Sequence, residues 1–128
     1  MRALVADRSA TTRRIVIRCL RVLGVQDVLE FADPREAAHA LPAEPDLIVL
    51  EWSPADDAAL DFVREARARE GLAPRIVVLS ERDRRPDVER IVALDIQGYV
   101  IKPFDTQVLI EQLATVLQSG GESAQAAA

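Results

Sequence analysis

The sequence predicts an α/β fold in which a parallel β-sheet lies between two layers of helices, and three observations support it. First, five short apolar runs alternate with five segments of helical periodicity, a pattern that produces parallel strands with right-handed crossovers. Second, Leu47–Leu50 is apolar throughout and lies between Pro45 and Pro54, which is typical of a strand buried on both faces. Third, 128 residues suffice for one domain with a real core but not for two.

The predicted strands are the five apolar runs, Ala3–Ala6, Val28–Phe31, Leu47–Leu50, Ile76–Leu79 and Tyr99–Ile101. Four of them are followed directly by groups capable of chemistry, which are Asp7, Glu51, Ser80 and Lys102. Ligands of open α/β sheets bind beyond the carboxyl ends of the strands, so we expect these four side chains to converge at one edge. Taken singly, each is also an ordinary polar residue at a strand end.

The predicted helices fill the segments between the strands. They cover about Thr11–Leu23, Pro34–Leu41, Ala58–Arg69, Pro86–Leu94 and a last segment whose core stripe is Leu109, Leu113, Val116 and Leu117. Gly24 and Gly71 are expected to end the first and third helices, and Asp105 to cap the start of the last one. We therefore expect an ordered domain over residues 1–118 and a disordered tail over residues 119–128.

Composition restricts the class of protein. Apolar residues make up 49% and charged residues 29%, which is ordinary for a soluble globular protein. A net charge of −5 argues against general binding to nucleic acid or anionic membranes, and the basic stretch Arg82–Arg85 suits a solvated helix start. No run has transmembrane length, no signal peptide is visible, and the single Cys19 is expected to be a buried core thiol, so we expect a cytoplasmic protein.

At the strand ends the chain resembles the receiver domains of two-component response regulators. The matching positions are Asp7, Glu51, Ser80, Tyr99 and Lys102–Phe104. The likeness extends from Arg2 to about Leu117 and is especially close to stand-alone, CheY-like chemotaxis receivers through Thr11–Val16 and Gly98–Phe104. The resemblance implies a three-layer flavodoxin-like (βα)5 sandwich, a five-stranded parallel sheet of order 2-1-3-4-5 and a cis bond between Lys102 and Pro103.

The resemblance also implies roles for these residues. In active members an Asp at the position of Glu51 is phosphorylated, and Mg²⁺ is held by that Asp and two acidic residues after the first strand. The hydroxyl at Ser80 and the amine at Lys102 would contact the phosphoryl oxygens, and the aromatic ring at Tyr99 would change rotamer to report phosphorylation. Asp7 matches the first acidic position.

Two positions depart from the family pattern. The phosphoacceptor position holds Glu51, whose extra methylene moves the carboxyl group by roughly 1.5 Å, and the second acidic position holds Arg8. Mg²⁺ requires near-octahedral oxygen ligation at about 2.1 Å, so losing a carboxylate and gaining a guanidinium both oppose its binding. In-line phosphoryl transfer depends on positioning and on metal charge, so both changes also oppose phosphorylation.

A charge count connects the two departures. Asp7 and Glu51 supply two negative charges, and Arg8 and Lys102 supply two positive ones, so the sum is zero without a metal. One hypothesis is that Arg8 reaches into the former cation position and pairs with Asp7 or Glu51. The alternative is that Arg8 points to solvent and that Glu51 pairs with Lys102 alone.

Two interpretations of Glu51 remain open at this point. Its carboxylate could mimic a phosphoryl group by reaching toward Ser80 and Lys102 and biasing Tyr99, or it could only neutralise Lys102. A carboxylate has one charge where a phosphoryl group has nearly two, which favours neutralisation. The adjacent Trp52 is expected to be partly buried. Asp56 and Asp57 could be alternative acceptors but suit a helix start.

We therefore expect a stand-alone atypical receiver that is not an enzyme and signals by binding a protein partner, without Asp phosphorylation, Mg²⁺ or another cofactor. The partner would be a signalling or output protein or a histidine kinase, and the resemblance implies a partner face around Arg90, Tyr99 and Gln107. No binding to nucleic acid or membrane is expected, and the chain would be a monomer or weak homodimer.

The alternative function is a receiver that accepts phosphate from a histidine kinase with Mg²⁺, in a phosphorelay or chemotaxis pathway. A flavodoxin-like cofactor binder lacks support because Asp7–Ala10 is not a glycine-rich phosphate loop.

Overall fold

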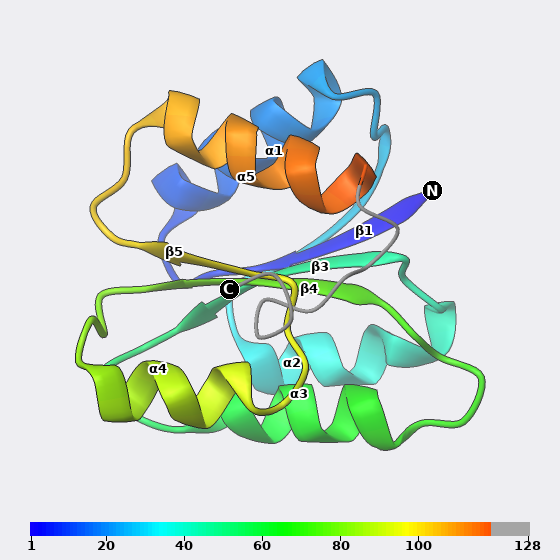
Figure 1. Ribbon diagram of the computed structural model, residues 1–128. Coiled ribbons are helices and arrows are strands. Elements are labelled where there is room, and N and C mark those ends of the chain that lie inside the picture. Colours follow the sequence, from blue (N-terminus) through cyan, green and yellow to red (C-terminus); the bar gives the residue numbers. More distant parts are fainter. Residues whose placement is uncertain (119–128) are drawn as a thin grey trace.

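The computed structural model describes residues 1–118, which form one five-stranded parallel sheet between two layers of helices (Figure 1). The strands are β1 (Arg2–Ala6), β2 (Asp27–Phe31), β3 (Leu47–Trp52), β4 (Arg75–Ser80) and β5 (Gly98–Ile101). Their order in the sheet is β2-β1-β3-β4-β5, and every neighbouring pair is parallel. The predicted fold class and strand order are therefore confirmed. The predicted tail, residues 119–128, lies outside the described residues.

The helices cover the two faces of the sheet unequally. One layer contains α1 (Ala10–Val22) and α5 (Thr106–Gln118), and the other contains α2 (Pro34–Ala37), α3 (Ala58–Ala68) and α4 (Arg85–Val92) (Figure 1). The second predicted helix is shorter than expected, because α2 passes into a 3₁₀ helix, η1 (Ala38–Ala43), that contains Pro42. Proline lacks a backbone N–H and cannot continue an α-helical hydrogen-bond ladder.

The helix ends follow their sequence signals. The side chain of Ser9 accepts a hydrogen bond from the Thr12 N–H at 3.2 Å and begins α1, while Gly24 follows its end with a φ of 92°. The predicted Asp105 cap is confirmed, because its carboxylate accepts from the Val108 N–H at 2.9 Å. These caps fix where α1 and α5 begin, directly beside the carboxyl ends of β1 and β5.

Alternation along the strands divides the core into two clusters. Side chains of successive strand residues point to opposite faces of a sheet. One cluster lies against α1 and α5 and includes Ala3, Val5, Leu47, Val49, Val77, Leu79 and Val100. The other lies against α2, α3 and α4 and includes Leu4, Ala6, Ile48, Leu50, Trp52, Ile76 and Val78. Cys19 is buried in the first cluster, as predicted.

The predicted end of the third strand is wrong, and so is the predicted partial burial of Trp52. β3 continues through Glu51 to Trp52, which pairs with Ser80 at the end of β4. Trp52 therefore keeps the alternation of Ile48 and Leu50 and lies in the core with no exposed surface. A loop residue at this position would have been free to leave the core, whereas a strand residue of this parity points into it.

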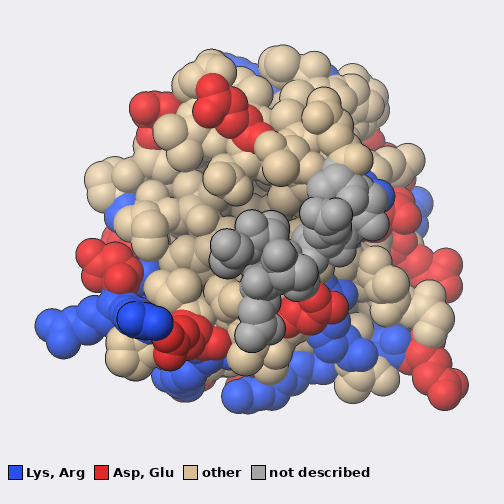
Figure 2. Space-filling model, in the orientation of Figure 1, with Lys and Arg blue, Asp and Glu red and all other residues tan. Residues whose placement is uncertain are grey.

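The surface has no single-signed face in the orientation of Figure 1. Figure 2 shows acidic and basic side chains interspersed there, with many of the basic ones along the lower edge of the view. Within residues 1–118, no helix combines the length and the apolar character needed to cross a bilayer.

Candidate functional site

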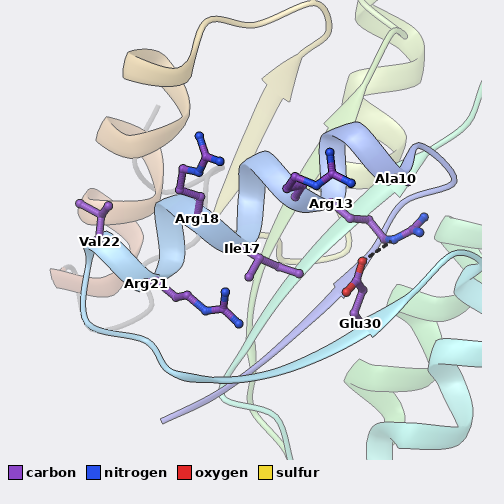
Figure 3. Close-up of a pocket in the computed structure, with 8 residues that line it drawn as sticks. Ala10, Arg13, Ile17, Arg18, Arg21, Val22 and Glu30 are labelled. Carbon is purple, nitrogen blue, oxygen red and sulfur yellow. Dashed lines mark hydrogen bonds and ion pairs between the residues drawn. The ribbon is translucent and has the colours of Figure 1, made fainter.

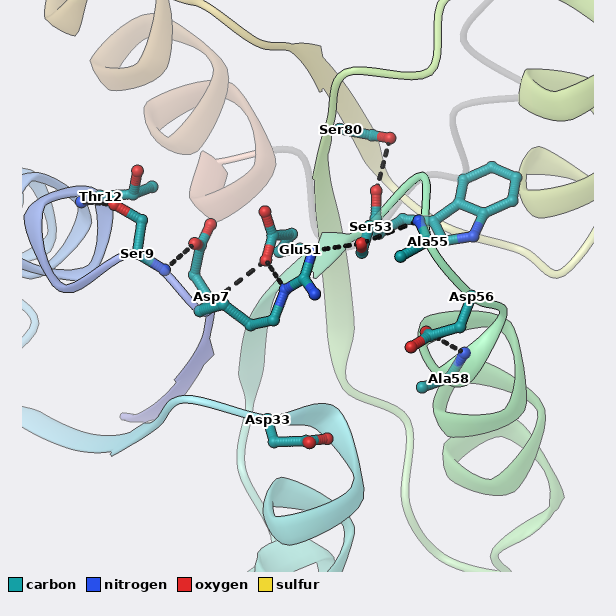
Figure 4. A network of polar contacts seen from close by, with 12 residues as sticks. Asp7, Ser9, Thr12, Asp33, Glu51, Ser53, Ala55, Asp56, Ala58 and Ser80 are labelled. Carbon is teal, nitrogen blue, oxygen red and sulfur yellow. Dashed lines mark hydrogen bonds and ion pairs between the residues drawn. The ribbon is translucent and has the colours of Figure 1, made fainter.

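Three charged side chains meet where β1, β3 and β5 end, on the α1 and α5 side of the sheet. Alternate residues of a strand point to the same side of the sheet. Asp7 therefore lies on the side of Ala3 and Val5, and Glu51 on the side of Leu47 and Val49. Lys102 lies on the side of Val100, two residues before it. The Lys102 Nζ donates to Asp7 Oδ2 and to Glu51 Oε2, both at 2.8 Å. Figure 4 shows Asp7 and Glu51 side by side at these strand ends. Lys102 thus bridges two carboxylates, and its peptide bond to Pro103 is cis as the resemblance implies.

Arg8 neutralises Glu51 at the carboxylate oxygen that Lys102 does not bind. Its backbone N–H donates to Glu51 Oε1 at 3.1 Å, and its guanidinium Nε lies 3.5 Å from that oxygen. The guanidinium also donates to the hydroxyl of Ser53, a buried residue just past β3. Of the two alternatives for Arg8, the structure shows the one in which it pairs with Glu51. Each oxygen of Glu51 therefore has a cationic partner.

The pKa of each of the three charged groups is set by burial acting against the hydrogen bonds that the group makes. Burial raises the pKa of Asp7, and the hydrogen bonds from Lys102 and from the Ser9 N–H offset this only in part. Burial also acts to raise the pKa of Glu51, but the hydrogen bonds from Lys102 and Arg8 outweigh it and hold that pKa below 4.5. For Lys102, burial acts to lower the pKa, and the bonds to both carboxylates outweigh it and raise that pKa above 10.5. At neutral pH the Glu51–Lys102 pair is therefore ionised.

Ser80 does not join this cluster, so the expectation that four side chains converge is wrong for one of them. Ser80 shares the parity of Ile76 and Val78 and lies on the opposite side of the sheet from Glu51. Its hydroxyl donates to the Trp52 carbonyl at 2.7 Å and accepts from the Arg82 N–H at 3.0 Å. The structure records no hydrogen bond between Ser80 and Glu51.

A second cluster forms around Trp52 on this opposite side, and sequence reasoning missed its central residue, Arg82. The Arg82 guanidinium lies 4.2 Å from the centroid of the Trp52 ring and donates to the carbonyls of Ser53 and Asp56 at 3.1 and 3.2 Å. The Arg82 carbonyl accepts from the Tyr99 hydroxyl at 2.6 Å. Arg82 is mostly buried rather than part of a solvated helix start, and it connects the loops after β3 and β4 with the ring of Tyr99.

Burial raises the pKa of Tyr99, so its hydroxyl stays protonated and keeps donating to the Arg82 carbonyl at neutral pH.

The only sequence signal for Arg82 was its position two residues after the end of a strand. Composition alone made that position resemble a solvated basic stretch.

The residues of the predicted partner face have separate surroundings. Arg90 binds Asp57 at 3.1 Å and lies 5.9 Å from the Trp52 ring, which directs it toward the loop after β3. Gln107 is exposed on α5 and donates to Glu111 at 3.1 Å, while Tyr99 is half-buried. The hydrogen bond from Arg90 is the main cause that lowers the pKa of Asp57, which with Asp56 precedes α3 as expected for a helix start.

Comparison with known proteins identifies the family. Residues 3–114 match the family described as the response regulator receiver domain. The chain belongs to this family. It is 33% identical over 120 residues to chemotaxis protein CheY1 of Helicobacter pylori strain J99, covering 91% of this chain and 97% of that protein. It is also 34% identical over 128 residues to a CheY homologue of Campylobacter jejuni, covering 97% and 98%.

Solved structures agree with this assignment. The structure of the chemotaxis response regulator CheY4 of Vibrio cholerae superimposes with a TM-score of 0.78 at 27% identity, covering 90% of this chain and 97% of that one. Receiver domains are signalling modules that interact with histidine kinases and downstream proteins. The chain is thus a CheY-like receiver domain.

The residues of this receiver do not fit the magnesium ion that the family implies. In place of a second acid, Arg8 directs its N–H and guanidinium at Glu51, and Lys102 binds the facing oxygens of Asp7 and Glu51. Oxygen ligands of Mg²⁺ must be free to approach the ion at about 2.1 Å. Among residues 1–118, no group of three acidic, histidine or cysteine side chains is placed to hold a metal.

Proposed function

We propose that this receiver domain signals by binding a partner protein in one state that its salt-bridged pocket maintains, without phosphorylation at position 51 and without Mg²⁺. The observation that carries the proposal is the pairing of both Glu51 oxygens, one with Lys102 Nζ at 2.8 Å and the other with Arg8 at 3.1 and 3.5 Å. Both oxygens of Glu51 are thus held in ion pairs that would have to open before either could attack a phosphoryl group. The guanidinium also adds positive charge where a divalent cation would have to enter.

Within this proposal Glu51 neutralises Lys102 and does not mimic a phosphoryl group. Support comes from the Ser80 hydroxyl, which bonds the Trp52 carbonyl, and from the Tyr99 hydroxyl, which bonds the Arg82 carbonyl. A phosphoryl mimic would have to reach the side of the sheet on which Ser80 and Tyr99 lie. Asp7, Arg8, Glu51 and Lys102 then form a structural network at a degenerate phosphorylation site.

The retained Lys102 and Ser80 favour a second candidate function, phosphate acceptance from a histidine kinase. Both residues match the family positions that contact phosphoryl oxygens, and the curated relatives named above are chemotaxis proteins. In this candidate Glu51 would have to leave both Lys102 and Arg8 before reacting. The phosphoacceptor would also lack the second acidic metal ligand.

The partner in our proposal is a protein that binds the surface formed by α4, β5 and α5. Ile101 and Val108 are 41% and 43% exposed there, next to the half-buried Tyr99 and the exposed Gln107. Arg90 belongs to this surface only if its bond to Asp57 opens. A cytoplasmic location and a monomeric or weakly dimeric state remain predictions.

Beryllofluoride binding separates the two candidate functions. Beryllofluoride with Mg²⁺ occupies a working receiver pocket, and Trp52, the only tryptophan, follows the acceptor position directly. We expect no change in Trp52 emission on adding Mg²⁺ alone or Mg²⁺ with beryllofluoride. A saturable, magnesium-dependent change would contradict the proposal and support phosphate acceptance.

A further inference from the structure

The outer side of α1 forms a basic groove with β2, which lies at the opposite edge of the sheet from β5. The groove has a volume of about 700 Å³ and is lined by Ala10, Arg13, Arg14, Ile17, Arg18, Arg21, Val22 and Glu30. Figure 3 shows Arg13 reaching Glu30 on β2, with Ile17 and Arg21 along the same helix and Arg18 projecting from it. β2 pairs only with β1, so it is the edge of the sheet on this side.

Three of the four arginines have no counter-charge among residues 1–118. Arg13 binds Glu30 at 2.7 Å and also donates to the Asp7 carbonyl at 2.7 Å, whereas Arg14, Arg18 and Arg21 form no hydrogen bond or ion pair there. The sequence of α1, ATTRRIVIRCLRV, contains no acidic residue. In a chain of net charge −5, this stretch of helix concentrates positive charge that the fold does not neutralise.

Most arginines outside α1 have a hydrogen-bond or ion-pair partner within the fold, unlike Arg14, Arg18 and Arg21. Ion pairs join an arginine to an acid at Arg2–Asp27, Arg35–Asp33, Arg64–Asp61, Arg82–Asp87, Arg85–Glu89 and Arg90–Asp57. Two more arginines donate to backbone carbonyls, Arg67 to Pro74 and Arg75 to Leu117. Arg14, Arg18 and Arg21 therefore form an exposed cluster that is not explained by contacts within the described part of the fold.

The spacing of these residues defines the shape of a complementary ligand. Arg14, Arg18 and Arg21 are four and then three residues apart, so they lie in one stripe that extends about 10 Å along the helix. The groove also has apolar surface, because Ile17 is half-buried beside the stripe and Val22 is 70% exposed at its end. A ligand that fits both features has carboxylates in a row of similar length and an apolar side chain between them.

We propose that the α1–β2 groove binds an acidic amphipathic segment of a partner protein. A protein segment is favoured over nucleic acid because the chain as a whole carries a net charge of −5, which repels a long polyanion. It is favoured over inorganic phosphate because Ile17 and Val22 offer apolar surface that a small anion would not use. The surface is separate from the Glu51 pocket, so this inference does not depend on the proposed function.

The test uses the full chain and a fluorescent synthetic peptide with glutamates four and three residues apart and leucines between them. Its binding is measured by fluorescence anisotropy at low and high salt, and the binding site is mapped by amide chemical shifts. The variant is Arg14→Glu with Arg18→Glu, and the matched control is Arg64→Glu with Arg69→Glu on the opposite helical layer, which changes the net charge equally. Circular dichroism confirms that both variants are folded. A single-stranded oligonucleotide and phosphatidylserine vesicles are the competing ligands.

We expect saturable peptide binding with shifts confined to α1 and β2, and a loss of affinity of at least about tenfold in the α1 variant but not in the control. Rising salt should weaken the binding, since exposed charges are screened. Equal losses in both variants would show that only net charge matters and would overturn the proposal. So would the absence of peptide binding, or tighter binding of the oligonucleotide or the vesicles through the same arginines.

Discussion

Replacing Lys102 with methionine tests the charge balance of the pocket most sharply. The substitution keeps an unbranched side chain only one atom shorter but removes the cation that lies 2.8 Å from both Asp7 and Glu51. The side chains of Lys102, Asp7 and Glu51 are 13%, 1% and 14% exposed, so solvent cannot replace the lost charge fully. Breaking a buried ion pair typically costs 3–5 kcal/mol, and Arg8 still neutralises Glu51, so we expect a loss of about 3 kcal/mol at neutral pH.

The pH dependence of this loss follows from the directions of the pKa shifts. In the wild type, the raised pKa of Lys102 adds stability that is fully present below pH 10.5 and is lost as pH rises through the folded-state pKa. The lowered pKa of Glu51 adds stability that is present above pH 4.5 and is lost as pH falls through its folded-state pKa. Without Lys102, the pKa of Asp7 should rise further, so protonation of Asp7 in mild acid should relieve part of the destabilisation.

The assay is urea denaturation followed by Trp52 fluorescence at about pH 7 and about pH 5. Trp52 is the only tryptophan and has no exposed surface in the folded state, so unfolding changes its environment. The control is Lys102→Met combined with Asp7→Asn, which removes the stranded carboxylate and should recover most of the loss. Unchanged stability of Lys102→Met at neutral pH, or a loss that neither acid nor the second substitution relieves, would refute this reasoning.

Two further predictions concern single residues in the two clusters. Asp7→Asn should raise the urea midpoint at neutral pH, because a raised carboxyl pKa means that the charged form costs stability above pH 3.8; a lower midpoint would contradict this direction. Arg82→Ala should cost about 1–3 kcal/mol and increase acrylamide quenching of Trp52, because it removes a ring contact and hydrogen bonds to two loop carbonyls. Arg90→Ala, whose guanidinium lies farther from the ring at 5.9 Å, is the matched control and should change quenching less. Equal quenching in both variants would contradict the claim that Arg82 is the central residue of the Trp52 cluster.

The fold could be predicted because local and global signals agree. The alternation of apolar runs with helical periodicity predicted the parallel sheet, and the predicted Gly24 and Asp105 lie at observed helix ends. The convergence of Asp7, Glu51 and Lys102 could also be expected, since all three follow strands of one parallel sheet. The pairing of Arg8 was one of two open alternatives, because a long side chain at a strand end has many rotamers that sequence does not distinguish.

The positions of Ser80 and Trp52 could not be predicted from the same pattern. The structure extends β3 through Glu51 to Trp52, and the parity of a strand decides on which side of the sheet each residue lies. Trp52 and Ser80 therefore face α3 and α4, while Glu51 faces α1 and α5. Arg82 was missed for another reason: its contacts join loops that are almost thirty residues apart, and no local pattern encodes such contacts.

The measurement that tests the central claim most directly is the intact mass of the protein after incubation with acetyl phosphate and Mg²⁺. The wild type is compared with Arg8→Asp combined with Glu51→Asp, which restores the three acidic residues of an active receiver around Asp7. A charge-balanced pocket without a metal predicts no added phosphoryl group on the wild type and a magnesium-dependent phosphoryl group on the double variant. A magnesium-dependent phosphoryl group on wild-type Glu51 would contradict the account.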